Sequence, residues 1–258
     1  MDIHPTAIVS PGAKLADDVV VRAFSIIGPD VTIGRGTVVG PHAVIEGITT
    51  IGACNEIFPF AAIGHPPQDI TYAGEETRVV IGDGNIIREN VTIHRGTPRG
   101  GGLTRIGNQS MFMAGAHVAH DCVIGDYVIM ANVAVLGGHV HIDDFAIVGG
   151  LVAVHQYVRI GAHAFIGGGS AVPLDIPPYM LAAGERAKLY GPNTTGLKRK
   201  NFSRDSISAL KKAYRLIFRS GLGMKEALSR VWEEVPPLPE VKVLMDFLTA
   251  PSKRGITR

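Results

Sequence analysis

The chain has few cysteines, no long apolar run and little net charge, and each shortage argues against a class of protein. Its 258 residues include two cysteines, Cys54 and Cys122, which form no CxxC pattern. We therefore expect no disulfide framework and a cytoplasmic location. No apolar run approaches the ~20 residues of a membrane-spanning helix, and the N-terminus lacks the basic and apolar regions of a signal peptide. The formal net charge of +2 argues neither for nor against a nucleic-acid partner.

Glycine, in contrast, is abundant, and it accompanies a strict repeat. The 32 glycines lie mostly in the first two thirds of the chain. An apolar residue stands at every sixth position from 3 to 63 and from 106 to 172, and at 81, 87 and 93 between these runs. Neither the period of an α-helix nor the alternation of a strand explains this spacing. A short strand followed by a corner does, and three such units close one triangular coil with the apolar residue pointing inward.

The repeat predicts a mainly β fold, a parallel β-helix of about nine or ten coils, over residues 1–186. Two polar segments rich in Pro or Gly, residues 65–80 and 95–105, break the register, and we expect them to loop out from the prism. The repeat ends after residue 172, and a Pro-containing exit segment follows. Residues 187–258 are predicted to form a C-terminal α-helical domain, with Ser203 as an N-cap and later helices over 224–235 and 239–250.

Stacking the coils brings distant residues together, because residues eighteen apart lie one above the other wherever the register is unbroken. From 106 to 172 this arithmetic predicts one cluster, which consists of His117, His120, Asp121, Gly138, His139, His155 and Gln156. A second column, mostly of very small residues, predicts a groove running past that cluster; its members are Ala114, Asn132, Gly150 and Gly168.

Three interpretations of the cluster remain open at this point. Histidines on a β-helix are most often solvated surface residues. A metal site is the second interpretation, since imidazole is a common metal ligand. However, the hexapeptide proteins that resemble γ-class carbonic anhydrases have an HxxxxH pattern, whereas this chain has HxxH followed by aspartate. The third is acyl transfer to a hydroxyl, with a histidine as general base, an adjacent carboxylate that fixes its tautomer, and a glycine N–H for the oxyanion.

Several stretches resemble one acyltransferase family, the UDP-N-acetylglucosamine O-acyltransferases of the first step of lipid A biosynthesis: "VTIHRGT", "GGLTRIG", "AHVAHDCVIGD", "LGGHV", "VHQYVRIGAHAFIGGGS" and "GLKRKNFS". The resemblance covers nearly the whole chain. It implies a left-handed β-helix and a homotrimer with active sites between neighbouring prisms. It also implies transfer of an (R)-3-hydroxyacyl chain from acyl carrier protein to the 3-hydroxyl of UDP-N-acetylglucosamine, without a cofactor, a metal or a nucleic-acid partner.

The resemblance also assigns roles to individual residues. It implies that His120 is the general base, that Asp121 orients it and that Gly138 supplies the oxyanion N–H. The implied substrate contacts are His117, His139, His155 and Gln156 for the substrate at large, Gln68 and Asp69 for the sugar, and Asn193 and Arg199 for the nucleotide and its phosphates. Gly168 matches the position that limits acyl length. A basic cluster is a candidate surface for the acidic carrier protein; it contains Lys198, Arg199, Lys200, Lys211, Lys212 and Arg215.

Three residues depart from the family pattern. Thr71 stands where a lysine is frequent, Thr195 where an acidic residue is common, and Lys200 where the family has arginine. Lysine lacks the planar fork of arginine, so the last exchange bears on recognition of phosphate. These departures leave a second expectation open, namely N-acylation of a 3-amino UDP-sugar on the same fold.

Overall fold

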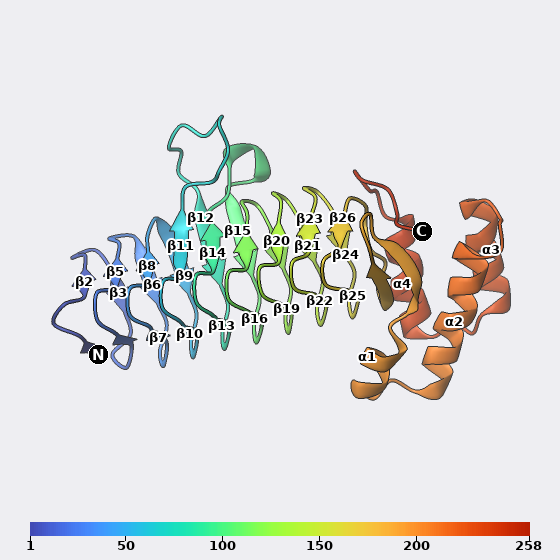
Figure 1. The fold of residues 1–258 in the computed structure, drawn as a ribbon, viewed down its shortest axis with the longest axis horizontal. Coiled ribbons are helices and arrows are strands. Elements are labelled where there is room, and N and C mark those ends of the chain that lie inside the picture. The colour runs from blue at the N-terminus through green and yellow to red at the C-terminus, as the bar shows by residue number, and fades with distance from the viewer.

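The computed structural model describes residues 1–258 as a three-sided prism of parallel strands with helices at its C-terminal end (Figure 1). The predicted left-handed parallel β-helix is confirmed. Each face of the prism is one sheet, and successive strands along the chain pass from sheet A to sheet B to sheet C. The edge between sheets B and C is called the BC edge below, and the AB and CA edges are named in the same way.

Sheet A contains β1 (Asp2–Ile3), β4 (Val20–Val21), β7 (Val38–Val39), β10 (Glu56–Ile57), β13 (Ile86–Ile87), β16 (Met111–Phe112), β19 (Ile129–Met130), β22 (Ile147–Val148), β25 (Phe165–Ile166), β27 (Met180–Ala183) and β28 (Lys188–Pro192). Sheet B contains β2 (Ile8–Val9), β5 (Ile26–Ile27), β8 (Val44–Ile45), β11 (Ala62–His65), β14 (Thr92–His94), β17 (His117–Val118), β20 (Val135–Leu136), β23 (Ala153–Val154) and β26 (Ala171–Val172). Sheet C contains β3 (Lys14–Leu15), β6 (Val31–Ile33), β9 (Ile48–Ile51), β12 (Arg78–Ile81), β15 (Leu103–Ile106), β18 (Val123–Ile124), β21 (His141–Ile142) and β24 (Arg159–Ile160).

The apolar positions of the six-residue repeat form the core of the prism. Nearly all of its apolar residues are buried, and the position two residues earlier is buried as well, often as a small residue such as Ala134 or Cys122. Ile3 is an exception, with 39% of its surface exposed, because no coil lies beneath the first one. Burial raises the pKa of the Cys122 thiol to about 12, so this cysteine is a packing residue and not a nucleophile.

Some of these inner positions are polar, which the apolar repeat did not predict. Asn55 Oδ1 accepts hydrogen bonds from the N–H and the Nδ2 of Asn85, at 2.9 and 3.1 Å. Asn85 Oδ1 in turn accepts a 2.9 Å bond from the N–H of Ser110. Each of these buried amide oxygens thus accepts hydrogen bonds from the next coil, so burying the polar side chains costs little free energy.

The two predicted loops leave the prism on the same side and lie next to each other (Figure 1). The first joins β11 to β12 over residues 66–77, and the second joins β14 to β15 over 95–102 and contains the 3-10 helix η1 (Pro98–Gly100). Both are shorter than the expected 65–80 and 95–105. The reason is strand pairing: Arg78–Ile81 pairs with Leu103–Ile106 in register, so these residues belong to sheet C.

The exit segment is more ordered than the sequence suggested. β27 continues sheet A in parallel with β25, and β28 returns antiparallel to it. The expected domain boundary at 186/187 falls between these two strands. Four helices follow: α1 (Thr194–Arg199), which was not predicted, α2 (Arg204–Phe218), α3 (Met224–Glu234) and α4 (Pro239–Thr249). Ser203 caps α2 as predicted, accepting from the N–H of Ser206. None of these helices is long and apolar enough to cross a membrane.

Candidate active site

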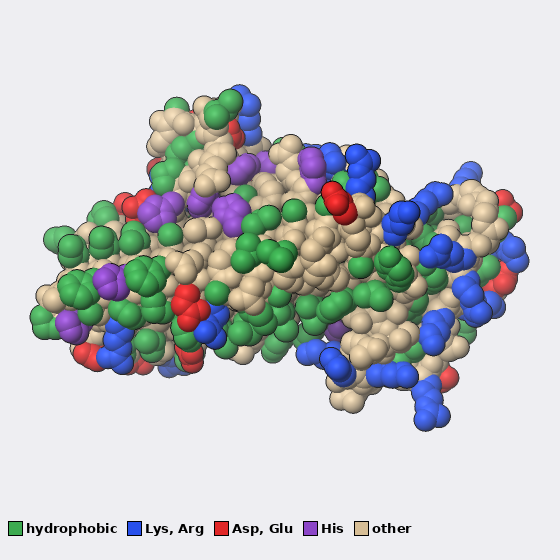
Figure 2. All heavy atoms as spheres, in the orientation of Figure 1, with side chains coloured by type: hydrophobic (Ala, Val, Ile, Leu, Met, Phe, Trp, Pro, Cys, Tyr) green, Lys and Arg blue, Asp and Glu red, His purple; other side chains and the backbone are tan.

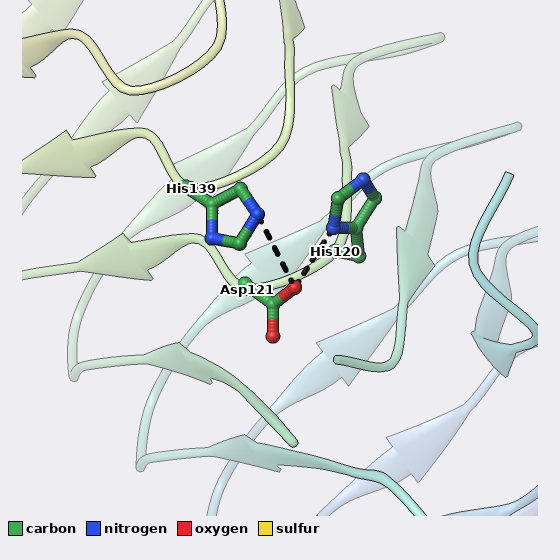
Figure 3. A group of neighbouring side chains, drawn as sticks. All are labelled: His120, Asp121 and His139. Atoms are coloured by element: carbon green, nitrogen blue, oxygen red, sulfur yellow. Dashed lines mark hydrogen bonds and ion pairs between the residues drawn. The ribbon is translucent and has the colours of Figure 1, made fainter. Parts of the chain in front are cut away.

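The corner that follows β17 places the central pair of the candidate site on the BC edge. His120 Nδ1 lies 2.8 Å from Asp121 Oδ2, and His139 Nε2 lies 3.8 Å from the same oxygen (Figure 3). The side chain of Asp121 is 1% exposed, whereas those of His120 and His139 are 16% and 18% exposed. The site therefore has a buried carboxylate beneath two partly open imidazoles. In Figure 2 histidines gather along the prism below the projecting loops.

The hydrogen bond to Asp121 fixes which nitrogen of His120 is free to react. A carboxylate accepts, so Nδ1 donates to Asp121, and the Nε2 lone pair remains available. A Cβ on residue 138 would lie 2.6 Å from His120 Nε2, so glycine alone leaves room for the ring in this position. The N–H of Gly138 donates no hydrogen bond within the chain. The free Nε2 of His120 thus lies close to the backbone of Gly138, whose N–H is unpaired, and such a pair is suited to acyl transfer.

The stacking arithmetic placed His139 above Asp121, and the structure confirms it and extends the column. The His139 ring packs edge-to-face against His120, with centroids 5.2 Å apart, and stacks on Tyr157 at 4.3 Å. Lys253, from the C-terminal tail, places its Nζ 4.2 Å from the centre of the Tyr157 ring. Burial lowers the pKa of His139, which favours its neutral form beside His120.

His117 lies on β17 and is held from the coil below. Thr92 Oγ1 and His117 Nδ1 are 2.7 Å apart, and the rings of His94 and His117 meet edge-to-face. Burial lowers the pKa of His117, and it lowers the pKa of His94 to about 4. His94 Nδ1 is buried without a hydrogen-bond partner. His94 was missed in the sequence because the loop insertion shifts its coil out of the eighteen-residue spacing.

The first projecting loop brings Asp69 to the same region. Its carboxylate accepts two 2.8 Å bonds, from the N–H and the hydroxyl of Thr71, and these lower its pKa; smaller contributions come from the charges of His120 and Arg99. Asp69, Thr71 and Arg99 line a cleft of about 100 Å³ between the two loops. Gln68 is exposed in the same loop, and its side chain makes no hydrogen bond within the chain.

The remaining predicted residues lie in two places, in the next coil of the BC edge, where His155 and Gln156 stack above Gly137 and Gly138 as predicted, and by the CA edge. His155 and Gln156 are exposed in the next coil, and His155 lines a separate hollow of about 280 Å³ with Arg186. Asn193 and Arg199 line a larger pocket of about 380 Å³ against sheet A and the CA edge, together with Phe165 and other residues. Asn193 caps α1 and donates to the carbonyl of His163.

The expected groove was wrong in one respect. The column of Ala114, Asn132, Gly150 and Gly168 does stack, but it forms the AB edge, whereas His120 lies on the BC edge of the same chain. The physical reason is the triangular coil: twelve residues separate His120 from Asn132, which is two corners and not a whole turn.

A metal is one alternative for this cluster, because ligand atoms of His120, Asp121 and His139 lie within 4.8 Å of one another. However, both oxygens of Asp121 already accept hydrogen bonds, Oδ1 from the N–H of Thr97 and Oδ2 from the Thr97 hydroxyl and His120. This donor set suits a carboxylate that orients an imidazole better than one that binds a cation.

Comparison with known proteins shows which family the chain is similar to. Residues 175–257 match the family model described as UDP N-acetylglucosamine O-acyltransferase, domain 2, and residues 12–47 and 103–138 match the bacterial transferase hexapeptide repeat. The acyl-[acyl-carrier-protein]--UDP-N-acetylglucosamine O-acyltransferase of Syntrophobacter fumaroxidans is 62% identical over 259 residues and covers 100% of both chains. The protein of the same description from Thermodesulfovibrio yellowstonii is 55% identical, over 100% of this chain and 99% of that one.

Solved structures give the same result. LpxA from Acinetobacter baumannii superposes with a TM-score of 0.96 at 46% identity, over 99% of each chain. The UDP-N-acetylglucosamine acyltransferase of Francisella novicida also gives a TM-score of 0.96, at 41% identity, over 99% of this chain and 94% of its own.

Proposed function

The chain belongs to the UDP-N-acetylglucosamine O-acyltransferases, and we propose that it transfers an (R)-3-hydroxyacyl chain from acyl carrier protein to the 3-hydroxyl of UDP-N-acetylglucosamine. This is the first step of lipid A biosynthesis. The observation that carries the proposal is the 2.8 Å contact between His120 Nδ1 and Asp121 Oδ2, with Gly138 against the opposite nitrogen.

The proposed reaction follows from these positions. His120 Nε2 takes the proton of the sugar hydroxyl as its oxygen attacks the thioester carbonyl carbon. Asp121 stabilises the imidazolium that forms, and the N–H of Gly138 donates to the oxyanion. The new C–O ester bond forms and the C–S bond breaks. The proton on His120 then passes to the departing sulfur, which leaves as the thiol of the carrier protein.

The proposed substrate contacts require a second copy of the chain. In one chain the His120–Asp121 pair lies on the BC edge, whereas Asn193 and Arg199 lie by the CA edge and Gly168 on the AB edge. We infer that neighbouring prisms in a homotrimer complete each site. Large apolar side chains exposed on sheet B and the AB edge support self-association; they include Ile8, Phe24, Phe60, Val133 and Leu151. Figure 2 shows hydrophobic side chains gathered over the N-terminal coils.

The helical end supplies the proposed surface for acyl carrier protein. Lys and Arg side chains gather there in Figure 2. Within the basic cluster, Lys198, Lys211 and Arg215 are exposed and have no acidic partner within ion-pair distance. An acidic carrier is attracted to such a surface.

The test is a transfer assay with a panel of 3-hydroxyacyl carrier proteins. UDP-N-acetylglucosamine and its 3-amino analogue serve as parallel acceptors, and the product is weighed by mass spectrometry. We expect an acylated UDP-sugar from the hydroxyl acceptor, and a loss of about 10³-fold or more in His120→Ala, with the assembly unchanged in size. A product from the amino acceptor alone would replace O-transfer by N-transfer. Absence of any product would reject acyl transfer.

A further inference from the structure

The second projecting loop holds the carboxylate of Asp121 through one residue, Thr97. The N–H of Thr97 donates to Asp121 Oδ1 at 2.9 Å, and its hydroxyl donates to Asp121 Oδ2 at 2.6 Å. Thr97 itself is 3% exposed, so neither bond competes with water. Both oxygens of the carboxylate are therefore oriented by a residue that lies outside the repeat.

The direction of the Thr97 hydroxyl is also fixed. Thr97 is the N-cap of η1, and its Oγ1 accepts a 3.2 Å bond from the N–H of Gly100. A hydroxyl has one hydrogen. Because the cap occupies a lone pair, that hydrogen is left for Asp121 Oδ2.

The loop closes directly on the carboxylate, and glycine is required for this. A Cβ on Gly100 would overlap the carboxyl group of Asp121, and one on Gly96 would lie 2.7 Å from Oδ1. From the other side, Thr104 Oγ1 accepts from the N–H of Asp121 at 2.8 Å. Asp121 is thus held at its backbone and at both carboxylate oxygens.

We propose that Thr97 is a positioning residue for acyl transfer. It holds Asp121 so that Oδ2 faces His120 Nδ1, and it thereby keeps His120 in the tautomer whose Nε2 is free to accept a proton. Thr97 acts through Asp121, since its N–H and its hydroxyl both donate to that carboxylate and neither is hydrogen-bonded to His120. This inference rests on the proposed function for its effect on rate, but not for its effect on the tautomer.

The first test is kinetic. Thr97→Val keeps the shape and the N–H but removes the hydroxyl, and we expect kcat to fall about 10- to 100-fold, the value of one hydrogen bond to a charged group. The KM for UDP-N-acetylglucosamine should change less than about twofold. Thr97→Ser keeps the hydroxyl and should restore most of kcat. The matched control is Thr37→Val, which removes a buried hydroxyl that donates to the carbonyl of Gly52 in a remote coil.

The second test does not depend on activity. Nitrogen NMR of ¹⁵N-histidine-labelled protein at alkaline pH reports the tautomer of His120, whose signal is identified by its loss in His120→Gln. We expect a protonated Nδ1 in the wild type and in Thr97→Ser, and a mixture of tautomers in Thr97→Val; Thr97→Ala replaces that variant if valine prevents folding.

The two tests separate the two claims. Suppose that the wild type is active, that Thr97→Val is as fast as Thr37→Val and that the His120 tautomer is unchanged. This result would overturn the positioning role while the proposed function stands. An inactive wild type would reject the function, and the tautomer comparison would then decide the role of Thr97 by itself.

Discussion

The imidazole rings of His94 and His117 meet edge-to-face, with centroids 5.0 Å apart and planes inclined at 82°. Burial lowers the pKa of His94 from 6.5 to about 4, and the neighbouring charge of His117 contributes in the same direction. The unfolded chain therefore binds more protons than the folded chain between these pH values. It follows that the free energy of unfolding decreases as the pH falls from 6.5 towards 4, by as much as about 3 kcal/mol for His94 alone.

Urea unfolding at a series of pH values across this window measures the effect. We expect His94→Gln to show a weaker loss of stability on acidification than the wild type. His4→Gln, at an exposed position in the first coil, should keep the wild-type dependence. An equal loss in His94→Gln and the wild type would show that His94 is not the group responsible.

Replacing Gly138 with Ala should displace the His120 ring, since the added Cβ would lie 2.6 Å from Nε2. We expect kcat to fall about 10²- to 10³-fold, comparable with the loss of an oxyanion-hole group, while the melting temperature stays close to that of the wild type. Gly223→Ala, where a Cβ meets nothing within 4 Å, should leave kcat unchanged. Full activity in Gly138→Ala would mean that the reaction does not need His120 in its observed position.

Replacing Gly168 with Met should shift the enzyme towards shorter acyl donors. Gly168 stacks on Gly150 in the AB-edge column, and a side chain there would occupy the path that the proposed trimer offers to the acyl tail. The measurement is kcat/KM for a series of donors, with the exposed helix position Ser229→Met as the control. From the family resemblance we expect the wild type to favour acyl chains of about twelve to fourteen carbons. Each methylene of the acyl chain that the introduced methionine keeps out of the groove should cost about 0.8 kcal/mol of binding free energy. An unchanged length preference would show that Gly168 does not limit acyl length.

The KM for acyl carrier protein should increase with salt, because the basic cluster attracts an acidic partner through screened charges. We expect an increase of about 3- to 10-fold from low to physiological ionic strength. Lys198→Gln combined with Lys211→Gln should reduce this dependence, whereas Lys14→Gln, on an exposed position of β3, should not. A salt-insensitive KM would argue against the cluster as the docking surface.

Part of the site was predictable because the coils between 106 and 172 are unbroken. There the eighteen-residue spacing placed His139 above Asp121 and Gly138 above His120, and both placements hold. The eighteen-residue spacing did not predict where Thr97 and His94 lie. His94 is the last residue before the second loop and Thr97 lies within it. The extra residues of this loop change the spacing between the paired coils from eighteen to twenty-five, as for Thr92 and His117.

The sequence by itself determined the prism, because a strict apolar period of six fits neither a helix nor an alternating strand and does fit a triangular coil with its apolar residues inside. It also determined that His139 lies above Asp121 and Gly138 above His120. Tertiary structure alone decided how Asp121 is held, because a polar loop carries no periodicity that predicts where its Thr97 folds back. It also decided that Asn193 lies by the CA edge, because that residue follows the end of the repeat.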